Sequence, residues 1–197
     1  MKRESEVLLL FDPSHKNGMV KHRENGIWYS LNVCEVMFSS GNLTEKIRVS
    51  SLASSHETVL DLYAGIGYFT LSFLVHSRVA FVFACEVNQN AVKYLKSNMT
   101  LNKIDPTRYA IFEGDNRETT KELIDKCDRV NLGLLPTSEP GYFPAIRALK
   151  AQGGVLHVHE NVENKQESKK AAEICNTLIE ICQSFEHKKS WKVQLLI

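Results

Sequence analysis

Residues 60–70 read Leu60-Asp61-Leu62-Tyr63-Ala64-Gly65-Ile66-Gly67-Tyr68-Phe69-Thr70, and this stretch decides the fold of the chain. The run that enters it, Val59 to Tyr63, is short and mostly apolar, as expected of a buried parallel strand. Gly65 and Gly67 then remove side chains from a turn, where ligand and backbone must approach closely. The apolar spacing from Tyr68 to His76 predicts a helix. Together they form the first half of a nucleotide-binding crossover.

Glu86 is the second feature of this pattern. It ends the next apolar run, Val79 to Cys85, and follows Gly65 by 21 residues. An acidic residue about 20 residues beyond the glycine turn is placed to accept hydrogen bonds from both ribose hydroxyls of a nucleotide. The alternative is a glycine turn that only links a strand to a helix, with Glu86 as an ordinary solvated carboxylate.

Two details of the stretch separate the nucleotides that it could bind. A dinucleotide fingerprint has a third glycine where this chain has Thr70, because a pyrophosphate lies on the helix N-terminus. Asp61, at the end of the strand, would repel a phosphate but could hold an ammonium group. These residues favour S-adenosyl-L-methionine over NAD.

Composition limits the class of protein. The chain has 197 residues, an apolar fraction of 43% and a net charge of +1. One α/β domain with some extra chain at an end is expected, and no large basic field indicates a nucleic-acid partner. The five cysteines form no CxxC pair, which indicates neither a disulfide framework nor a zinc site. Without a signal peptide or a bilayer-spanning apolar run, we expect a cytoplasmic protein with no membrane contact.

The N-terminal part of the chain predicts a small β element. Asn25-Gly26 separates two extended runs, Met19–Arg23 and Ile27–Val33, which is a strong hairpin signal. A further short strand is expected at Val7–Phe11, and a helix at Thr44–Ala53. We expect residues 1–37 to be the remnant of an N-terminal domain.

Strands and helices then alternate. The expected strands are Val59–Tyr63, Val79–Cys85, Tyr109–Glu113, Arg129–Leu135, Gly154–Val162 and Trp191–Ile197. The expected helices are Tyr68–His76, Asn88–Lys103, Arg117–Lys126, Pro144–Ala151 and Lys165–Phe185. This alternation predicts an α/β fold, with a doubly wound, mostly parallel Rossmann-like sheet over residues 38–197.

Ligands of such sheets lie beyond the carboxyl ends of the strands, where the strand order reverses. The groups that end the expected strands are Asp61, Glu86, Asp115, Asn116 and the segment 133–136, and they should line one crevice. Asp115 and Asn116 could read an adenine edge; the alternative is an Asx turn that closes a strand.

A metal site is not expected. His157 and His159 lie two residues apart and would share one face of a strand, but no third ligand has a suitable spacing.

Five stretches together resemble a known family: 38–48, 61–70, 84–88, 114–117 and 154–162. They are similar to the tRNA-modifying family with the class I methyltransferase fold that pairs a guanine methyltransferase with the aminocarboxypropyltransferase of wybutosine synthesis. The resemblance runs from about Gly26 to Val162, with a weaker continuation to the end of the chain.

The resemblance implies cofactor contacts at Ser39, Lys46, Glu86, Asp115 and Asn116. Taken alone, Lys46 reads as a charge on a solvated helix face; the family implies that it pairs with the carboxylate of S-adenosyl-L-methionine. The full candidate set for cofactor binding is Ser39, Lys46, Asp61, Tyr63, Gly65, Gly67, Glu86, Asp115 and Asn116. The sequence assigns no catalytic residue; Asp61, His157 and His159 are the only candidates for a general base.

The end of the fourth strand separates the two branches of the family. It reads Leu132-Gly133-Leu134-Leu135-Pro136, where the methyltransferases carry an Asn-Leu-Pro motif. The turn at 38–42 also lacks the arginine of that branch. The resemblance thus implies transfer of the 3-amino-3-carboxypropyl group to a tricyclic guanine derivative beside the anticodon of tRNA(Phe), with release of methylthioadenosine.

Two alternatives stay open: a tRNA guanine methyltransferase, and a non-catalytic cofactor-binding fragment. The second is included because the resemblance implies a member shortened at both ends. The sequence does not fix the oligomeric state.

Overall fold

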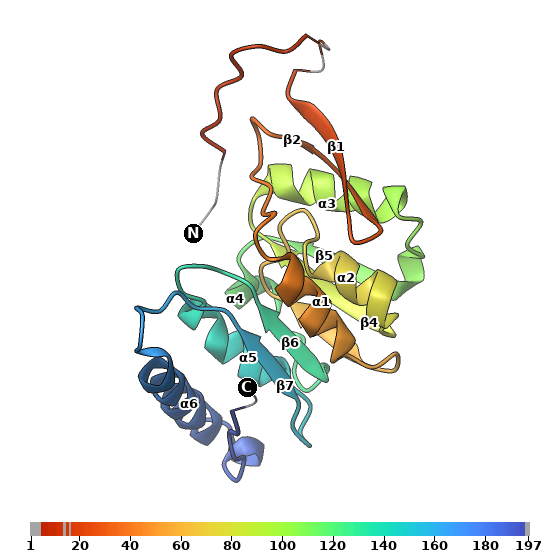
Figure 1. Cartoon of the computed structure of the whole chain (residues 1–197). Coiled ribbons are helices and arrows are strands. Elements are labelled where there is room, and N and C mark those ends of the chain that lie inside the picture. Colours follow the sequence, from red (N-terminus) through yellow and green to blue (C-terminus); the bar gives the residue numbers. More distant parts are fainter. Residues whose placement is uncertain (1–4, 14, 16, 196–197) are drawn as a thin grey trace.

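The computed structural model describes residues 5–13, 15 and 17–195, and it is built around a five-stranded parallel sheet (Figure 1). The strands are β3 (Thr58–Asp61), β4 (Phe81–Glu86), β5 (Tyr109–Glu113), β6 (Arg129–Leu132) and β7 (Val155–Val158). Their order in the sheet is β5-β4-β3-β6-β7. The order therefore reverses between β3 and β6, which is where such sheets bind ligands.

Helices cover both faces of the sheet, as expected of a doubly wound fold (Figure 1). On one face are α1 (Leu43–Ser51), α2 (Thr70–Ser72) and α3 (Gln89–Leu101); on the other are α5 (Tyr142–Ala148) and α6 (Glu167–Gln183). Alternation along the strands explains this division: Val59 packs in the first buried cluster, and its neighbour Leu60 packs in the second. The α/β class predicted from the sequence is confirmed.

The predicted hairpin is also confirmed. It consists of β1 (Met19–Glu24) and β2 (Ile27–Asn32), joined by Asn25 and Gly26 with φ angles of 47° and 78°. Positive φ at both central residues defines the tight turn that matches the twist of paired strands.

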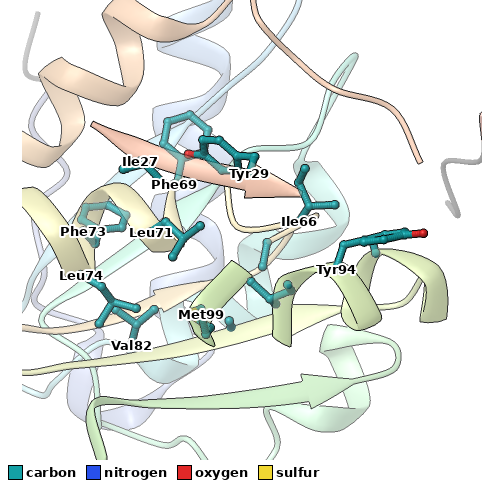
Figure 2. Packing of buried hydrophobic residues seen from close by; sticks show 14 of the residues in the cluster. Ile27, Tyr29, Ile66, Phe69, Leu71, Phe73, Leu74, Val82, Tyr94 and Met99 are labelled. Carbon is teal, nitrogen blue, oxygen red and sulfur yellow. The ribbon is translucent and has the colours of Figure 1, made fainter. Parts of the chain in front are cut away.

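The hairpin packs against α3 (Figure 1). Asn98 and Asn102 of α3 accept hydrogen bonds from the backbone N–H groups of Ser30 (2.7 Å) and Trp28 (2.8 Å) of β2. Figure 2 shows Ile27 of β2 beside the buried side chains around α2. Ile27 and these side chains belong to the same buried hydrophobic cluster. The hairpin therefore shares the core of the sheet domain; a domain boundary at residue 37 stays a prediction.

Two predicted strands are wrong. Residues 7–11 have no regular structure, and Leu8, Leu10 and Phe11 are about four-fifths exposed or more (78%, 88% and 81%). Residues 191–195 are also irregular, and 196–197 lie outside the described part of the chain. An apolar run becomes a strand only where another strand offers hydrogen-bonding partners. In the described residues, neither run lies along an edge of the sheet.

Two predicted helices are shorter or less regular than expected. In place of Arg117–Lys126 the structure has α4 (Asn116–Thr119), followed by turns in which Asp125 adopts a φ of 55°. The helix predicted from Tyr68 begins at Thr70 and continues as the π-helical turn η1 (Phe73–Ser77). It ends at Arg78, whose left-handed φ of 53° is incompatible with a further turn.

Three short 3₁₀ turns complete the described elements: η2 (Pro106–Arg108), η3 (Glu139–Gly141) and η4 (Glu186–Lys188). Across residues 5–13, 15 and 17–195, no helix combines the length and the apolar character needed to cross a bilayer.

Candidate functional site

A cavity of about 690 Å³ lies at the carboxyl ends of β3, β4, β5 and β6. Its walls come from four places: the segment 36–42 before α1, the glycine turn after β3, the residues that follow β4 and β5, and the segment 133–140 after β6. Sequence analysis predicted this location, because the ends of parallel strands meet at one edge of a sheet.

The glycine turn forms the floor of this cavity. Gly65 adopts a φ of 57°, and a Cβ placed there would come within 2.7 Å of the Tyr68 ring. A larger residue at 65 would therefore meet both strain and a clash. Gly67 (φ 105°) does not line the cavity, and a Cβ there would meet Leu71 at 2.9 Å. Its role is close packing of the turn against α2.

Glu86 is held rigidly beside the turn. Its Oε2 accepts a hydrogen bond from the N–H of Gly65 (2.8 Å), and its Oε1 accepts one from the N–H of Asn88 (2.8 Å). Burial raises the pKa of the carboxyl, and these two backbone donors oppose the rise. Each carboxylate oxygen has a second lone pair. Glu86 lines the cavity with acceptor capacity left for a ligand hydroxyl, so the reading as an ordinary solvated carboxylate does not hold.

Asp115 and Asn116 line the cavity beyond β5. Asp115 caps α4 by accepting from the N–H of Arg117 (2.9 Å), so the Asx-turn reading of this residue is correct. The Arg117 guanidinium also binds its carboxylate and lowers the pKa of Asp115 to about 2. Asn116 is buried, and its Nδ2 donates to the carbonyl of Leu62 (2.9 Å). Asp115 and Asn116 therefore shape the turn after β5 and also line the cavity.

Lys46 does not line the cavity and is not on a solvated face. Its side chain is 2% exposed, and its ammonium forms a buried ion pair with Glu24 of the hairpin. The Nζ also lies 3.4 Å from the carbonyl oxygen of Ser39, which does line the cavity. The rings of Tyr29, Phe38 and Tyr68 surround the ammonium, with centroids 5.9, 5.7 and 5.6 Å away. Lys46 thus stands directly behind the cavity wall.

Asp61 was expected in the crevice, but it lies beneath the turn and is fully buried. Its carboxyl accepts hydrogen bonds from the hydroxyl of Thr70 (2.7 Å) and from Nδ2 of Asn131 (3.0 Å). Burial raises the pKa of Asp61, and these bonds oppose the rise. The expectation failed because Asp61 pairs with Ala84, two residues before Glu86 along β4, so its side chain lies deeper in the sheet than the strand ends that line the cavity. Tyr63, two residues later, does line the cavity.

The two histidines considered as a base do not line the cavity. His157 is buried, its Nε2 lies 2.7 Å from Nη1 of Arg129, and burial lowers its pKa to about 3. His159 pairs with Glu45 (3.1 Å) and stacks on Phe69, which is part of the cavity wall (ring centroids 5.0 Å apart). Sequence reasoning missed this aromatic wall of Phe38, Tyr68 and Phe69, although the aromatic residues beside the glycine turn were a visible signal.

Comparisons with known proteins agree with this geometry. A family model, the TRM5/TYW2 methyltransferase domain, matches residues 20–188. The chain is 46% identical over 177 residues to the tRNA wybutosine-synthesizing protein 2/3/4 of Arabidopsis thaliana, covering 90% of this chain and 17% of that protein. It is 51% identical over 157 residues to the tRNA wybutosine-synthesizing protein 2 homolog of Danio rerio, covering 79% and 37%. The chain therefore spans well under half of these relatives.

Solved structures show the same arrangement. M. jannaschii TYW2 in complex with AdoMet superposes with a TM-score of 0.77 at 32% identity, covering 86% of this chain and 74% of that one. P. horikoshii TYW2 in complex with MeSAdo gives a TM-score of 0.75 at 30% identity, covering 86% and 61%. The match of the family model to most of the chain, together with these structures, establishes that the chain belongs to the TRM5/TYW2 methyltransferase domain family.

Proposed function

We propose that this chain binds S-adenosyl-L-methionine and transfers its 3-amino-3-carboxypropyl group to a tricyclic guanine derivative next to the anticodon of tRNA(Phe). Methylthioadenosine would be the by-product. The observation that carries the proposal is the similarity of most of the chain to proteins named tRNA wybutosine-synthesizing protein 2. Because the chain spans only part of those relatives, the activity of the whole protein is an inference for this chain.

The cavity fits the proposed ligand. A volume of about 690 Å³ lies within the range of about 300–1,000 Å³ that small-molecule sites have. Glu86 would accept a hydrogen bond from the ribose, while Asp115 and Asn116 would contact the adenine. Gly65 leaves room for the ligand at the turn, and Ser39 and Tyr63 complete the wall. Lys46 would bind the methionine carboxylate only if its ammonium left the ion pair with Glu24. Gly67 and Asp61 do not line the cavity, and they would act by stabilising the conformation of the glycine turn.

The segment after β6 favours aminocarboxypropyl transfer over methyl transfer. Glycine or leucine, Gly133 or Leu134, stands where the methyltransferases of the family have an asparagine. Neither residue presents a side-chain amide to a base, and a Cβ at Gly133 would come within 3.3 Å of the Phe69 ring, so the segment packs closely there. The relative solved with MeSAdo supports the same branch, because methylthioadenosine is what remains of the cofactor after transfer of its aminocarboxypropyl group.

The proposed reaction depends more on the relative position of acceptor and cofactor than on proton transfer by a side chain. S-adenosyl-L-methionine would supply an electrophilic γ-methylene, whose bond to the positive sulfur breaks with both electrons remaining on sulfur. The acceptor ring carbon forms the new bond and loses a proton. Because that leaving group is good, in-line placement at near-attack distance is the main task of the residues around the cavity. Asp61, His157 and His159 lie outside the lining, so we assign no general base.

Mass spectrometry of tRNA tests the proposal directly. The chain is incubated with labelled S-adenosyl-L-methionine and with tRNA(Phe) carrying the tricyclic intermediate. We expect a mass increase of one aminocarboxypropyl group on that nucleotide, with methylthioadenosine in the supernatant. In a parallel reaction with tRNA(Phe) that carries unmodified guanine, methylated guanine and adenosylhomocysteine would instead identify a methyltransferase. Cofactor binding without either product would identify a non-catalytic module. Both latter results contradict the proposal.

A further inference from the structure

We propose that Glu160 is a positioning residue that holds the acceptor-facing wall of the cavity, the segment 133–141. This inference rests on the proposed function, because that function gives the cavity an acceptor as well as a cofactor. Glu160 lies just beyond β7 and does not line the cavity itself. It acts through the segment that it binds.

Strand order assigns the acceptor to this wall. Glu86 at the end of β4 and Asn116 after β5 line the cavity, and in the proposed function they mark its ribose and adenine ends. The sheet continues from β4 to β3 and then to β6. A cofactor that begins at β5 therefore presents its sulfonium near β3, and the space beyond it lies against the segment after β6. Gly133, Leu135 and Pro136 of that segment line the cavity.

One carboxylate oxygen of Glu160 binds three groups in and beside the middle of this wall. Oε1 of Glu160 accepts hydrogen bonds from the hydroxyl of Thr137 (2.9 Å), the backbone N–H of Ser138 (2.9 Å) and the hydroxyl of Tyr142 (2.8 Å). Thr137 lines the cavity, Ser138 is fully buried, and Tyr142 begins α5. Hydrogen bonds to an ionised acceptor are roughly twice as strong as neutral ones. Burial and the Glu160 carboxylate both raise the pKa of Tyr142, which keeps this phenol in its donating form.

The backbone on either side of Glu160 completes the clamp. The N–H of His159 donates to the carbonyl of Leu132 (3.2 Å), and the N–H of Asn161 donates to that of Pro136 (2.8 Å). Residues 159–161 therefore run beside residues 132–138 past the end of the sheet. Glu160 sits between these two backbone bonds and adds the side-chain contacts that fix Thr137 and Ser138.

The contacts of Glu160 are separate from the cofactor side. The two oxygens of Glu86 are held by Gly65 and Asn88, and none of the groups bound to Glu160 follows β4 or β5. Loss of the clamp should therefore disturb the acceptor and leave the cofactor in place. A purely structural carboxylate would weaken both functions together.

The test is Glu160→Gln, which keeps the shape of the side chain and one oxygen acceptor but removes the charge that strengthens the three hydrogen bonds to Oε1. We expect kcat/KM for tRNA to fall about tenfold to a hundredfold, the loss expected of a displacement of about 1 Å. We expect the calorimetric Kd for S-adenosyl-L-methionine to stay unchanged. Amide hydrogen exchange in the peptide spanning 133–141 should become faster. Glu163→Gln, an exposed carboxylate three residues beyond Glu160 and outside both the segment 133–141 and the cavity lining, is the matched control and should change none of these values.

Tyr142→Phe is the milder second variant. It removes one donor, should give a smaller loss in the same direction, and should add little to Glu160→Gln because the two groups share one bond. A cofactor Kd that weakens as much as tRNA turnover, or unchanged exchange in 133–141, overturns the proposal. The exchange measurement needs no turnover. A wild-type chain that transfers nothing therefore refutes the proposed function, while the clamp is judged separately on exchange.

Discussion

Glu86 is the residue whose geometry most directly implies binding. Its two oxygens are fixed by backbone donors, and the residue lines the cavity. We expect Glu86→Ala to weaken binding of S-adenosyl-L-methionine by about 1.5–3 kcal/mol, the value of a lost hydrogen bond to a charged group. Isothermal calorimetry measures this. Glu113→Ala, at the end of the next strand and outside the cavity, is the control; equal affinities of both variants and wild type would remove Glu86 from the site.

Lys46 raises a different question at the same scale, because a buried ion pair obscures its role. Lys46→Met leaves Glu24 buried without a partner, which should destabilise the fold by about 3–5 kcal/mol in urea unfolding. Adding Glu24→Gln should restore most of that stability, since it removes the unpaired buried charge.

The double variant separates structure from function. If Lys46 pairs with the cofactor carboxylate during the reaction, transfer of the aminocarboxypropyl group stays low after stability returns. It should fall more than cofactor affinity falls. Kinetics that report both possible by-products measure this. Recovery of turnover together with stability would instead limit Lys46 to a structural role behind the cavity wall.

Among the elements, α5 ends in an unusual cap. The Lys188 side chain is fully buried, and its ammonium donates to the carbonyls of Ile146 (2.8 Å) and Leu149 (2.6 Å). It also pairs with Asp125 (2.7 Å). A cation at a helix C-terminus satisfies carbonyls that have no partner within the helix.

Removal of this cap should be costly. We expect Lys188→Met to destabilise the chain by about 3–5 kcal/mol, because it leaves buried carbonyls without a donor and leaves Asp125 with His187 alone as its partner. Lys189→Met, which removes an exposed neighbouring charge, should change stability by at most about 1 kcal/mol. Urea unfolding followed by circular dichroism compares the two. Similar midpoints for both variants would mean that water replaces the ammonium.

The contacts of Lys188 also explain why one element, the strand expected at the C-terminal end, could not be predicted correctly from the sequence. Tyr109–Glu113 was predicted with its observed bounds because its run of apolar residues is a local signature of a strand, even at the half-buried edge of the sheet. The strand predicted at the C-terminal end was wrong: Lys188 ties this end of the chain to α5, and the indole N–H of Trp191 donates to the carbonyl of Ala151 (3.1 Å). Such contacts join residues 40 or more positions apart. No local pattern contains that information.

The candidate site follows the same rule. Glu86, Asp115 and Asn116 could be placed because they follow strands directly, and the parallel sheet brings strand ends together. The pairing of Lys46 with Glu24 could not be predicted, because it depends on how the hairpin docks on the sheet domain. The clamp at Glu160 was equally hidden, since its donors lie after a different strand.

For the whole molecule, charge predicts how tRNA should be held. The chain carries 24 Lys and Arg against 23 Asp and Glu, a net charge of +1, so its overall field does little to attract a polyanion. We expect this chain by itself to bind tRNA no more tightly than nonspecific complexes do at physiological salt, about 10⁻⁴–10⁻⁶ M. What affinity there is should come from local phosphate contacts. It should therefore fall steeply as salt rises, because each contact releases condensed counterions. Fluorescence anisotropy with labelled tRNA across a salt series measures both quantities. Binding tighter than micromolar at physiological salt, or binding insensitive to salt, would show instead that base contacts within the cavity dominate recognition.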